Sequence, residues 1–277
     1  MAKVLALTSY PVKGCAGIPV PDATVTWAGL AHDRSFMVVD PDGVFRSQRR
    51  DRRLALVRPE IDADGDHLTL HAPGIAPVRL AVATTPPRRP VRLFGEPLWG
   101  IDQGEAAAAW LTEVLGAPSR LVRVPPDHDR VVHGHTPGTS GYADSSPLHL
   151  VSLSSLDALN ERITARGGHP VPMSRFRPNI VVDGWTTPHT EDRLRRVTIG
   201  ETDLGYTKLA IRCAVTLVDQ DTGAKSGPEP LRTLATYRRA SQGGVAFGVK
   251  FAVLRPGKLS VGDEVTITAW GDSELLD

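Results

Sequence analysis

The chain of 277 residues has little cysteine, few lysines and no long apolar run. Its two cysteines, Cys15 and Cys213, lie far apart, which excludes a dense disulfide framework and fits a reducing, cytoplasmic location. No stretch approaches the roughly 20 apolar residues that a membrane-spanning helix needs, so we expect no membrane partner. The formal net charge of +1 gives no reason to expect a nucleic-acid partner.

The first third of the sequence alternates short apolar runs with turn residues. The run at 36–39 is typical of a buried strand, and the Asp-Pro-Asp-Gly that follows it has the composition of a hairpin turn. Many short strands with regular turn signals predict an all-β, barrel-like unit. The other strands expected here are 4–7, 23–27, 44–47, 54–57, 67–70, 78–83 and 91–94.

The rest of the chain mixes both types of element. An alanine-rich helix is expected at 105–115, ended by Gly116. Residues 123–147 read as a long loop, and long loops are usually functional or disordered. We place a domain boundary there, which divides the chain into 1–122 and 123–277. The second part is expected to hold helices at 154–163 and 231–239 and strands at 180–182, 214–218, 247–254 and 261–270.

Cys213 is the residue whose surroundings most suggest chemistry. It ends an apolar, strand-like run and directly follows Arg212. A guanidinium beside a thiol favours the thiolate, which is the form that attacks electrophiles and binds soft metals. The alternative is a buried, inert cysteine that acts as a small hydrophobic residue.

Two segments near the N-terminus contain candidate anion-binding residues. Lys13 precedes Gly14, whose missing side chain lets a ligand approach the backbone, although a surface lysine in a turn explains the pair as well. Arg34 lies just before the run at 36–39, where a guanidinium can contact a phosphate or carboxylate in bidentate fashion. An ion pair with Asp33 or Asp40 is the alternative for this arginine.

Two later segments have the same character. Arg177 and Asn179 flank a proline at the start of an expected strand, so both side chains could face one ligand, or they could simply bond the end of the strand. Ser152 lies where a strand runs into a helix, and the N–H groups at a helix N-terminus form an anion site. Plain helix capping explains this serine equally.

Seven segments, taken in order, carry a resemblance to a known family. They are YPVKGCAG, GLAHDRSFMVVDPDGVFRSQR, YADSSPLHLVS, RFRPNIVVDG, RCAVTLVDQDTG, EPLRTLATYRR and FGVKFAVLRPGKLSVGD. Together they resemble the MOSC proteins, a family named after the C-terminal domain of the molybdenum cofactor sulfurase. The similarity is greatest to the subgroup with an N-terminal β-barrel domain, typified by the mitochondrial amidoxime-reducing component and its bacterial relatives.

The resemblance implies a β-rich α+β fold, in which a small N-terminal barrel-like domain precedes a MOSC β-barrel domain with a few helices. It also implies a molybdenum cofactor (Mo-molybdopterin) bound between the two domains. Cys213 would be the catalytic thiolate ligand of molybdenum. The cofactor's phosphate and pterin would be held by Lys13, Arg34 and Arg177, with support from Gly14, Ser152, Asn179 and Arg212.

Two positions depart from the family. Gly14 replaces a frequent serine, which removes one hydroxyl contact. Ala210 replaces the first cysteine of a C-x-R-C pattern in the amidoxime-reducing subgroup, which puts the substrate preference in doubt.

The activity that the resemblance implies is reduction of N-hydroxylated or N-oxide small molecules with electrons from a separate partner, such as a ferredoxin or flavin reductase. Residues 123–147 would give the substrate access, with Asp144 and His149 as candidate proton donors. The alternative is a molybdenum-cofactor carrier or sulfur-transfer protein, in which Cys213 carries a persulfide or holds the cofactor transiently.

Overall fold

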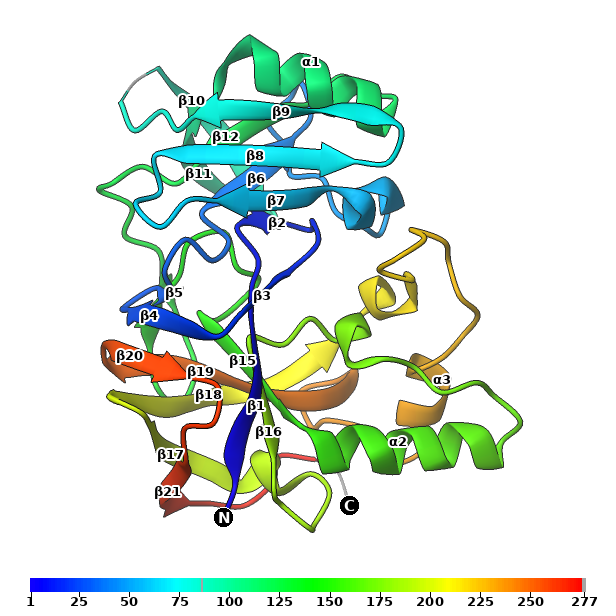
Figure 1. Cartoon of the computed structure of the whole chain (residues 1–277). Helices are drawn as coiled ribbons and strands as arrows, with labels where there is room; N and C mark the ends of the chain where they lie inside the picture. The colour runs from blue at the N-terminus through cyan, green and yellow to red at the C-terminus, as the bar shows by residue number, and fades with distance from the viewer. Residues whose placement is uncertain (86, 276–277) are drawn as a thin grey trace.

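The computed structural model describes residues 1–85 and 87–275. Strands dominate this part of the chain and three α-helices accompany them, which confirms the predicted α+β, β-rich class. Figure 1 shows two groups of elements. One contains β6 to β12 with α1, and the other contains a large sheet with α2 and α3. None of the helices in the described part of the chain is long and apolar enough to cross a membrane.

The largest sheet has eight strands and combines both ends of the chain. Its strand β1 pairs antiparallel with β16 on one side and with β3 on the other. Strands β15 and β16 run parallel, and helix α2 (Leu153–Ala165) joins them, as a parallel crossover requires. The strand order is β21 (Val265–Trp270), β17 (Leu194–Ile199), β18 (Thr202–Arg212), β19 (Val245–Arg255), β15 (Leu148–Ser152), β16 (Ile180–Asp183), β1 (Lys3–Ser9) and β3 (Ile18–Val20).

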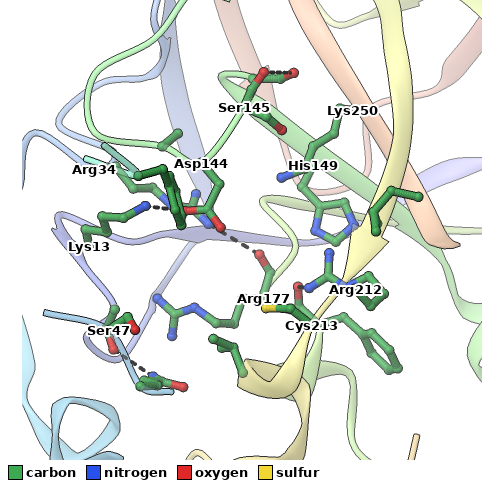
Figure 2. Close-up of a pocket in the computed structure, with 18 of the residues that line it drawn as sticks. Lys13, Arg34, Ser47, Asp144, Ser145, His149, Arg177, Arg212, Cys213 and Lys250 are labelled. Carbon is green, nitrogen blue, oxygen red and sulfur yellow. Dashed lines mark hydrogen bonds and ion pairs between the residues drawn. The ribbon is translucent and has the colours of Figure 1, made fainter. Parts of the chain in front are cut away.

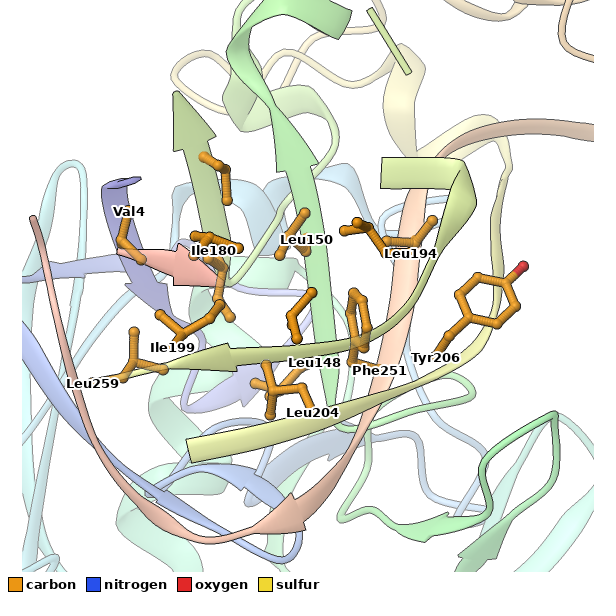
Figure 3. Packing of buried hydrophobic residues seen from close by; sticks show 14 of the residues in the cluster. Val4, Leu148, Leu150, Ile180, Leu194, Ile199, Leu204, Tyr206, Phe251 and Leu259 are labelled. Atoms are coloured by element: carbon orange, nitrogen blue, oxygen red, sulfur yellow. The ribbon is translucent and has the colours of Figure 1, made fainter. Parts of the chain in front are cut away.

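The main hydrophobic core lies against this sheet. Leu148, Leu150, Ile180, Leu204 and Phe251 are all completely buried in it, and Figure 3 shows their side chains converging between the strands. Burial of such apolar surface is the main stabilising contribution to folding. The core fixes β15, β18 and β19 side by side, and these strands carry residues of the site described below.

The other group of elements is built mainly from the first half of the chain. A five-stranded sheet has the order β10 (Arg88–Leu93), β11 (Glu96–Asp102), β12 (Arg120–Arg123), β6 (Phe36–Val39) and β2 (Val12–Lys13). Helix α1 (Gly104–Leu115) shares a core cluster with it and ends at Gly116, which is left-handed. The smaller sheets are β7 (Arg58–Ile61), β8 (His67–Ala72) and β9 (Ile75–Ala81); β20 (Gly257–Ser260), β4 (Asp22–Thr26) and β5 (Gly29–Leu30); and β13 (Val131–Val132) and β14 (Gly138–Thr139).

The barrel prediction needs correction, because no sheet of the described residues closes on itself. The large sheet comes nearest to closure. A bridge between Lys3 and Glu264 links the start of β1 to the chain just before β21. Backbone bonds from Val4 N to Asp263 O (2.9 Å) and from Val265 N to Ala2 O (2.9 Å) accompany this bridge. The division at residue 122 stays a prediction, and the pairing of β1 with β16 crosses it.

Most predicted elements are confirmed, and the errors fall on short apolar runs. Both long helices and the strands at 4–7, 36–39, 67–70, 180–182 and 247–254 are present. The strands predicted at 54–57 and 214–218 are wrong, because these runs form 3-10 turns over Arg52–Leu56 and Ala214–Leu217. Residues 44–47 make only isolated bridges, and the helix predicted at 231–239 is limited to α3 (Leu231–Leu234). Runs of four or five apolar residues do not distinguish a strand from a helical turn.

Candidate functional site

A cavity of about 470 Å³ lies where loops of the N-terminal half face strands β18 and β19. This volume is typical of a small-molecule or cofactor site. Two of its walls differ in origin. The N-terminal wall is formed by Lys13, Gly14 and Arg34 with Asp144, and the sheet wall by Lys208, Arg212, Cys213 and Lys250. Figure 2 shows the basic side chains and the Cys213 sulfur surrounding one space.

Cys213 lies at the end of β18, where the sheet gives way to a turn. Its backbone is extended, and its carbonyl oxygen accepts bonds from the Thr216 backbone N–H (3.0 Å) and hydroxyl (2.9 Å). The side chain is partly exposed and lines the cavity. The thiol is therefore held at a fixed point and is accessible from inside the cavity, as expected of a ligand or nucleophile.

Lys13 is buried and pairs with Asp144 across the N-terminal wall. Its ammonium group also lies 5.6 Å from the centre of the Phe45 ring and 5.2 Å from that of Phe94, as in a cation–π contact. Burial lowers the pKa of Lys13, while Asp144 opposes that shift. Burial disfavours the Asp144 carboxylate too, but Lys13 outweighs it and the pKa of Asp144 is lowered.

Arg34 is held by a network that also fixes Asn179. Its NH1 donates to Asp33 Oδ2 (2.6 Å) and to Asn179 Oδ1 (3.0 Å). The Asn179 amide nitrogen donates to Asp33 Oδ1 (3.1 Å) and to the Thr8 carbonyl oxygen (3.1 Å). The sequence allowed either an ion pair with an aspartate or a ligand-binding role for Arg34, and both apply, because Arg34 pairs with Asp33 and still lines the cavity. Asn179 acts mainly by positioning Arg34.

Tyr10 lies between two guanidinium groups. The central guanidinium carbons of Arg34 and Arg177 each lie 4.3 Å from its ring centre. Both arginines have a left-handed backbone, with φ values of 47° and 54°. This conformation costs free energy for a residue with a side chain, and such strain concentrates at functional sites. Arg177 also donates to Gln220 Oε1 (3.1 Å).

Arg212 extends the positive charge to the residue before the thiol. Its NH2 donates to the Phe176 carbonyl oxygen (2.8 Å), while its buried Nε has no partner among the described residues. Burial lowers the pKa of Arg212 to about 10 despite the neighbouring Cys213. An anion in the cavity would offset the cost of burying this charge.

The sequence arguments missed Lys208 and Lys250. Burial, together with the nearby Arg212 and Arg34, lowers the pKa of Lys250 to about 7. The available signal was a lysine within a mainly apolar segment of each strand, KLAI in β18 and VAFGVKFAVL in β19. Around the cavity, the described residues supply eight lysines and arginines and a single carboxylate, Asp144.

Neither expected proton donor carries a proton that it can readily release. Burial lowers the pKa of His149 well below its usual value, and its Nε2 lies 3.3 Å from the Phe247 carbonyl oxygen. The ring is therefore neutral near pH 7, and Nε2 carries the hydrogen that this bond requires. Asp144 is ionised, because Lys13 holds its pKa low.

Most of the residues predicted for the site do meet. One does not: Ser152 is buried at the N-cap of α2, where its hydroxyl donates to Glu191 Oε2 (2.8 Å) and accepts from Ser155 N–H (3.2 Å). It is absent from the cavity lining among the described residues, so helix capping explains it. The predicted residues that line the cavity are Lys13, Gly14, Arg34, Arg177, Asn179, Arg212 and Cys213.

Comparison with known families agrees with this arrangement. Residues 1–118 match the MOSC N-terminal beta barrel domain and residues 131–266 match the MOSC domain. The chain therefore belongs to the family of MOSC-domain proteins that carry this N-terminal domain, and the predicted resemblance is confirmed.

Its similar relatives include two proteins of one kind. The chain is 35% identical to mitochondrial amidoxime-reducing component 1 of Homo sapiens, over 95% of this chain and 82% of the relative. It is 36% identical to mitochondrial amidoxime reducing component 2 of Rattus norvegicus, over 92% and 80%. It is also 30% identical to molybdenum cofactor sulfurase of Danio rerio, over 88% of this chain but only 31% of that protein.

Proposed function

We propose that this protein binds a molybdenum cofactor and reduces N-hydroxylated or N-oxide compounds, with electrons from a separate protein such as a ferredoxin or flavin reductase. The observation that carries the proposal is a partly exposed thiol, Cys213, on the wall of a cavity to which the described part of the chain contributes eight basic residues. Relatives of similar length are named for amidoxime reduction, which supports this class of substrate.

The charges of the cavity fit a phosphate-bearing, anionic cofactor. Eight cations face a single carboxylate among the described lining residues, and like charges at close range repel one another. Within residues 1–85 and 87–275, Arg212 Nε is a buried donor without a partner. Lys13, Arg34, Arg177 and Arg212 would bind the anionic part of the cofactor, and each is already held by at least one partner in the protein.

The position of Cys213 fits a single soft metal ligand. Thiolates suit such metals, and coordination removes the thiol proton. The fixed carbonyl of Cys213 and the turn that follows it orient the sulfur. The bound cofactor supplies the two-electron, oxygen-transfer chemistry, and the protein supplies ligation, orientation and charge.

The experiment measures molybdenum by elemental mass spectrometry and amidoxime reduction with reduced methyl viologen as the electron source. Protein from a cofactor-competent host is compared with Cys213→Ala and with the matched control Cys15→Ala. We expect near-stoichiometric metal and turnover in the wild type and in Cys15→Ala, and loss of both in Cys213→Ala. Turnover that survives in Cys213→Ala would rule out this mechanism.

The same experiment separates the proposal from the carrier or sulfur-transfer alternative. A carrier would hold the cofactor without reducing any amidoxime. It would also yield a Cys213 persulfide, which mass spectrometry of the intact protein detects as one additional sulfur.

A further inference from the structure

Two lysines of the sheet wall face each other in the cavity. Lys208 on β18 pairs in register with Lys250 on β19, and Lys250 pairs on its other side with His149 on β15. Residues directly opposite in an antiparallel pair project from the same face, with Cβ atoms about 5 Å apart. All three side chains line the cavity. The sheet thus places two ammonium groups in one row beside a neutral imidazole.

This row lacks the carboxylate partners that three other basic residues of the cavity have. Lys13 pairs with Asp144, Arg34 with Asp33, and Arg46 with Asp51. Among the described residues, neither Lys208 nor Lys250 makes a hydrogen bond or ion pair through its side chain. Like charges directly opposite on a sheet are destabilising. A bound anion would reverse the sign of that interaction.

The groups that face Lys250 come from several elements. Burial is the main cause that lowers the pKa of Lys250 to about 7, and the positive charges of Arg212, Arg34 and Lys13 add to this shift. Asp144 is the opposing negative charge, but it is already paired with Lys13. Lys250 is therefore largely neutral above pH 7 until an anion approaches, and binding of the anion would draw in a proton.

The row lies away from the thiol. Lys208 precedes Cys213 by five positions along β18, at most about 16 Å of extended chain. In Figure 2, Lys250 lies in the upper part of the space that both residues line, and Cys213 lies in the lower part. A group bound by the row would thus lie several ångströms from the sulfur, as expected for the remote end of a substrate. Binding at such a remote point can orient the reacting end.

We propose that Lys208 and Lys250 form an anion subsite for the substrate, so that the protein prefers N-oxygenated substrates that carry a carboxylate remote from the reacting nitrogen. This inference rests on the proposed function for the identity of the substrate. The N-terminal wall and Arg177 remain for the cofactor.

The kinetic test compares neutral benzamidoxime with 4-carboxybenzamidoxime in the holoenzyme. In Lys250→Met and Lys208→Met we expect the KM of the carboxylated substrate to rise about tenfold or more, the scale of a lost charge-assisted contact. The KM of benzamidoxime should stay within about twofold. Lys250→Arg should retain most of the preference, and Lys3→Met, an exposed lysine on β1, should behave as the wild type. Equal changes for the two substrates would overturn the subsite.

A binding measurement tests the anion subsite even if the protein reduces no amidoxime. Calorimetry at pH 8.5 in Tris and in HEPES should show uptake of roughly one proton per 4-carboxybenzamidoxime bound by the wild type. Lys250→Met should show none and should bind more weakly. If no amidoxime is reduced but this binding difference is present, the proposed function fails and the subsite stands. Loss of molybdenum from Lys250→Met would instead assign the lysine to the cofactor and refute the subsite.

Discussion

Both walls of the cavity carry positive charge, but they differ in whether the protein itself supplies partners for that charge. On the N-terminal wall, Lys13 and Arg34 are fixed by a carboxylate and by aromatic rings before any ligand arrives. On the sheet wall, Lys208 and Lys250 have no such partners among the described residues, and Arg212 keeps an unpaired donor. The first arrangement is fixed before a ligand binds, and it stabilises the fold. In the second, the positive charges repel one another, and binding of an anion would reduce that repulsion.

The largest contrast concerns the two thiols. Cys15 is completely buried behind the N-terminal wall, and burial raises its pKa to about 12. At pH 8 only about one Cys15 in 10⁴ is thus a thiolate, whereas Cys213 is partly exposed to the cavity. In cofactor-free protein we expect Ellman's reagent to modify Cys213 at least about a hundredfold faster than Cys15. Peptide mapping of the modified protein identifies the residue, and equal rates would contradict the contrast.

Removal of a cation from the N-terminal wall should destabilise the fold. Arg34→Met leaves the Asp33 carboxylate, whose side chain is 1% exposed, without its guanidinium. We expect a loss of about 3 kcal/mol in the free energy of unfolding, as for other buried pairs that lose one partner. Urea unfolding of the cofactor-free protein measures this loss. Arg49→Met, which removes an exposed arginine at the rim, is the control and should change little.

Removal of a lysine from the sheet wall should, in contrast, stabilise the fold. Lys250→Met should increase the free energy of unfolding of the cofactor-free protein by about 1–2 kcal/mol at pH 6. At this pH Lys250 is charged in the folded wild type, and its buried, positively charged surroundings disfavour that charge. The folded pKa is about 7 and the unfolded one about 10.4. The gain should therefore be largest below pH 7, shrink as pH rises between these values, and vanish above them. Urea unfolding at pH 6 and pH 9.5 tests this trend, and destabilisation at pH 6 would abolish the distinction between the walls.

Substitution of Ser152, which lies just beyond the sheet wall, should have the smallest effect on cofactor binding in the cavity. Ser152→Ala removes the N-cap of α2, which typically costs about 1 kcal/mol. Molybdenum content should nevertheless equal that of the wild type, because the serine bonds Glu191 and Ser155 and does not line the cavity. Reduced metal content in a variant that still folds would return Ser152 to the cofactor site.

The local sequence was sufficient to predict the long helices. It was also sufficient to identify basic residues that lie next to a glycine, a proline or the start of a strand. The alanine-rich helix and its terminal Gly116 were predictable, because capping and periodicity act within a few residues. Lys13, Arg34 and Arg177 stood out beside glycine, proline or a strand start. Lys250 did not, because its importance comes from being opposite Lys208 on another strand. Cross-strand register depends on the whole sheet, and the sequence of either strand alone does not reveal it.

Strand β1 pairs with a strand that follows it by more than 170 residues. Leu7 of β1 pairs with Ile180 of β16, so the large sheet remains incomplete until most of the chain has been synthesised. Contacts of such long sequence separation form slowly, since a long loop must close first. A fragment that ends near residue 122 would leave β1 without its β16 neighbour, and one that begins there would leave the edge of β16 open to other chains. A boundary near residue 122 in genetic fusions or in exchanges between relatives would therefore separate β1 from its partner strand β16.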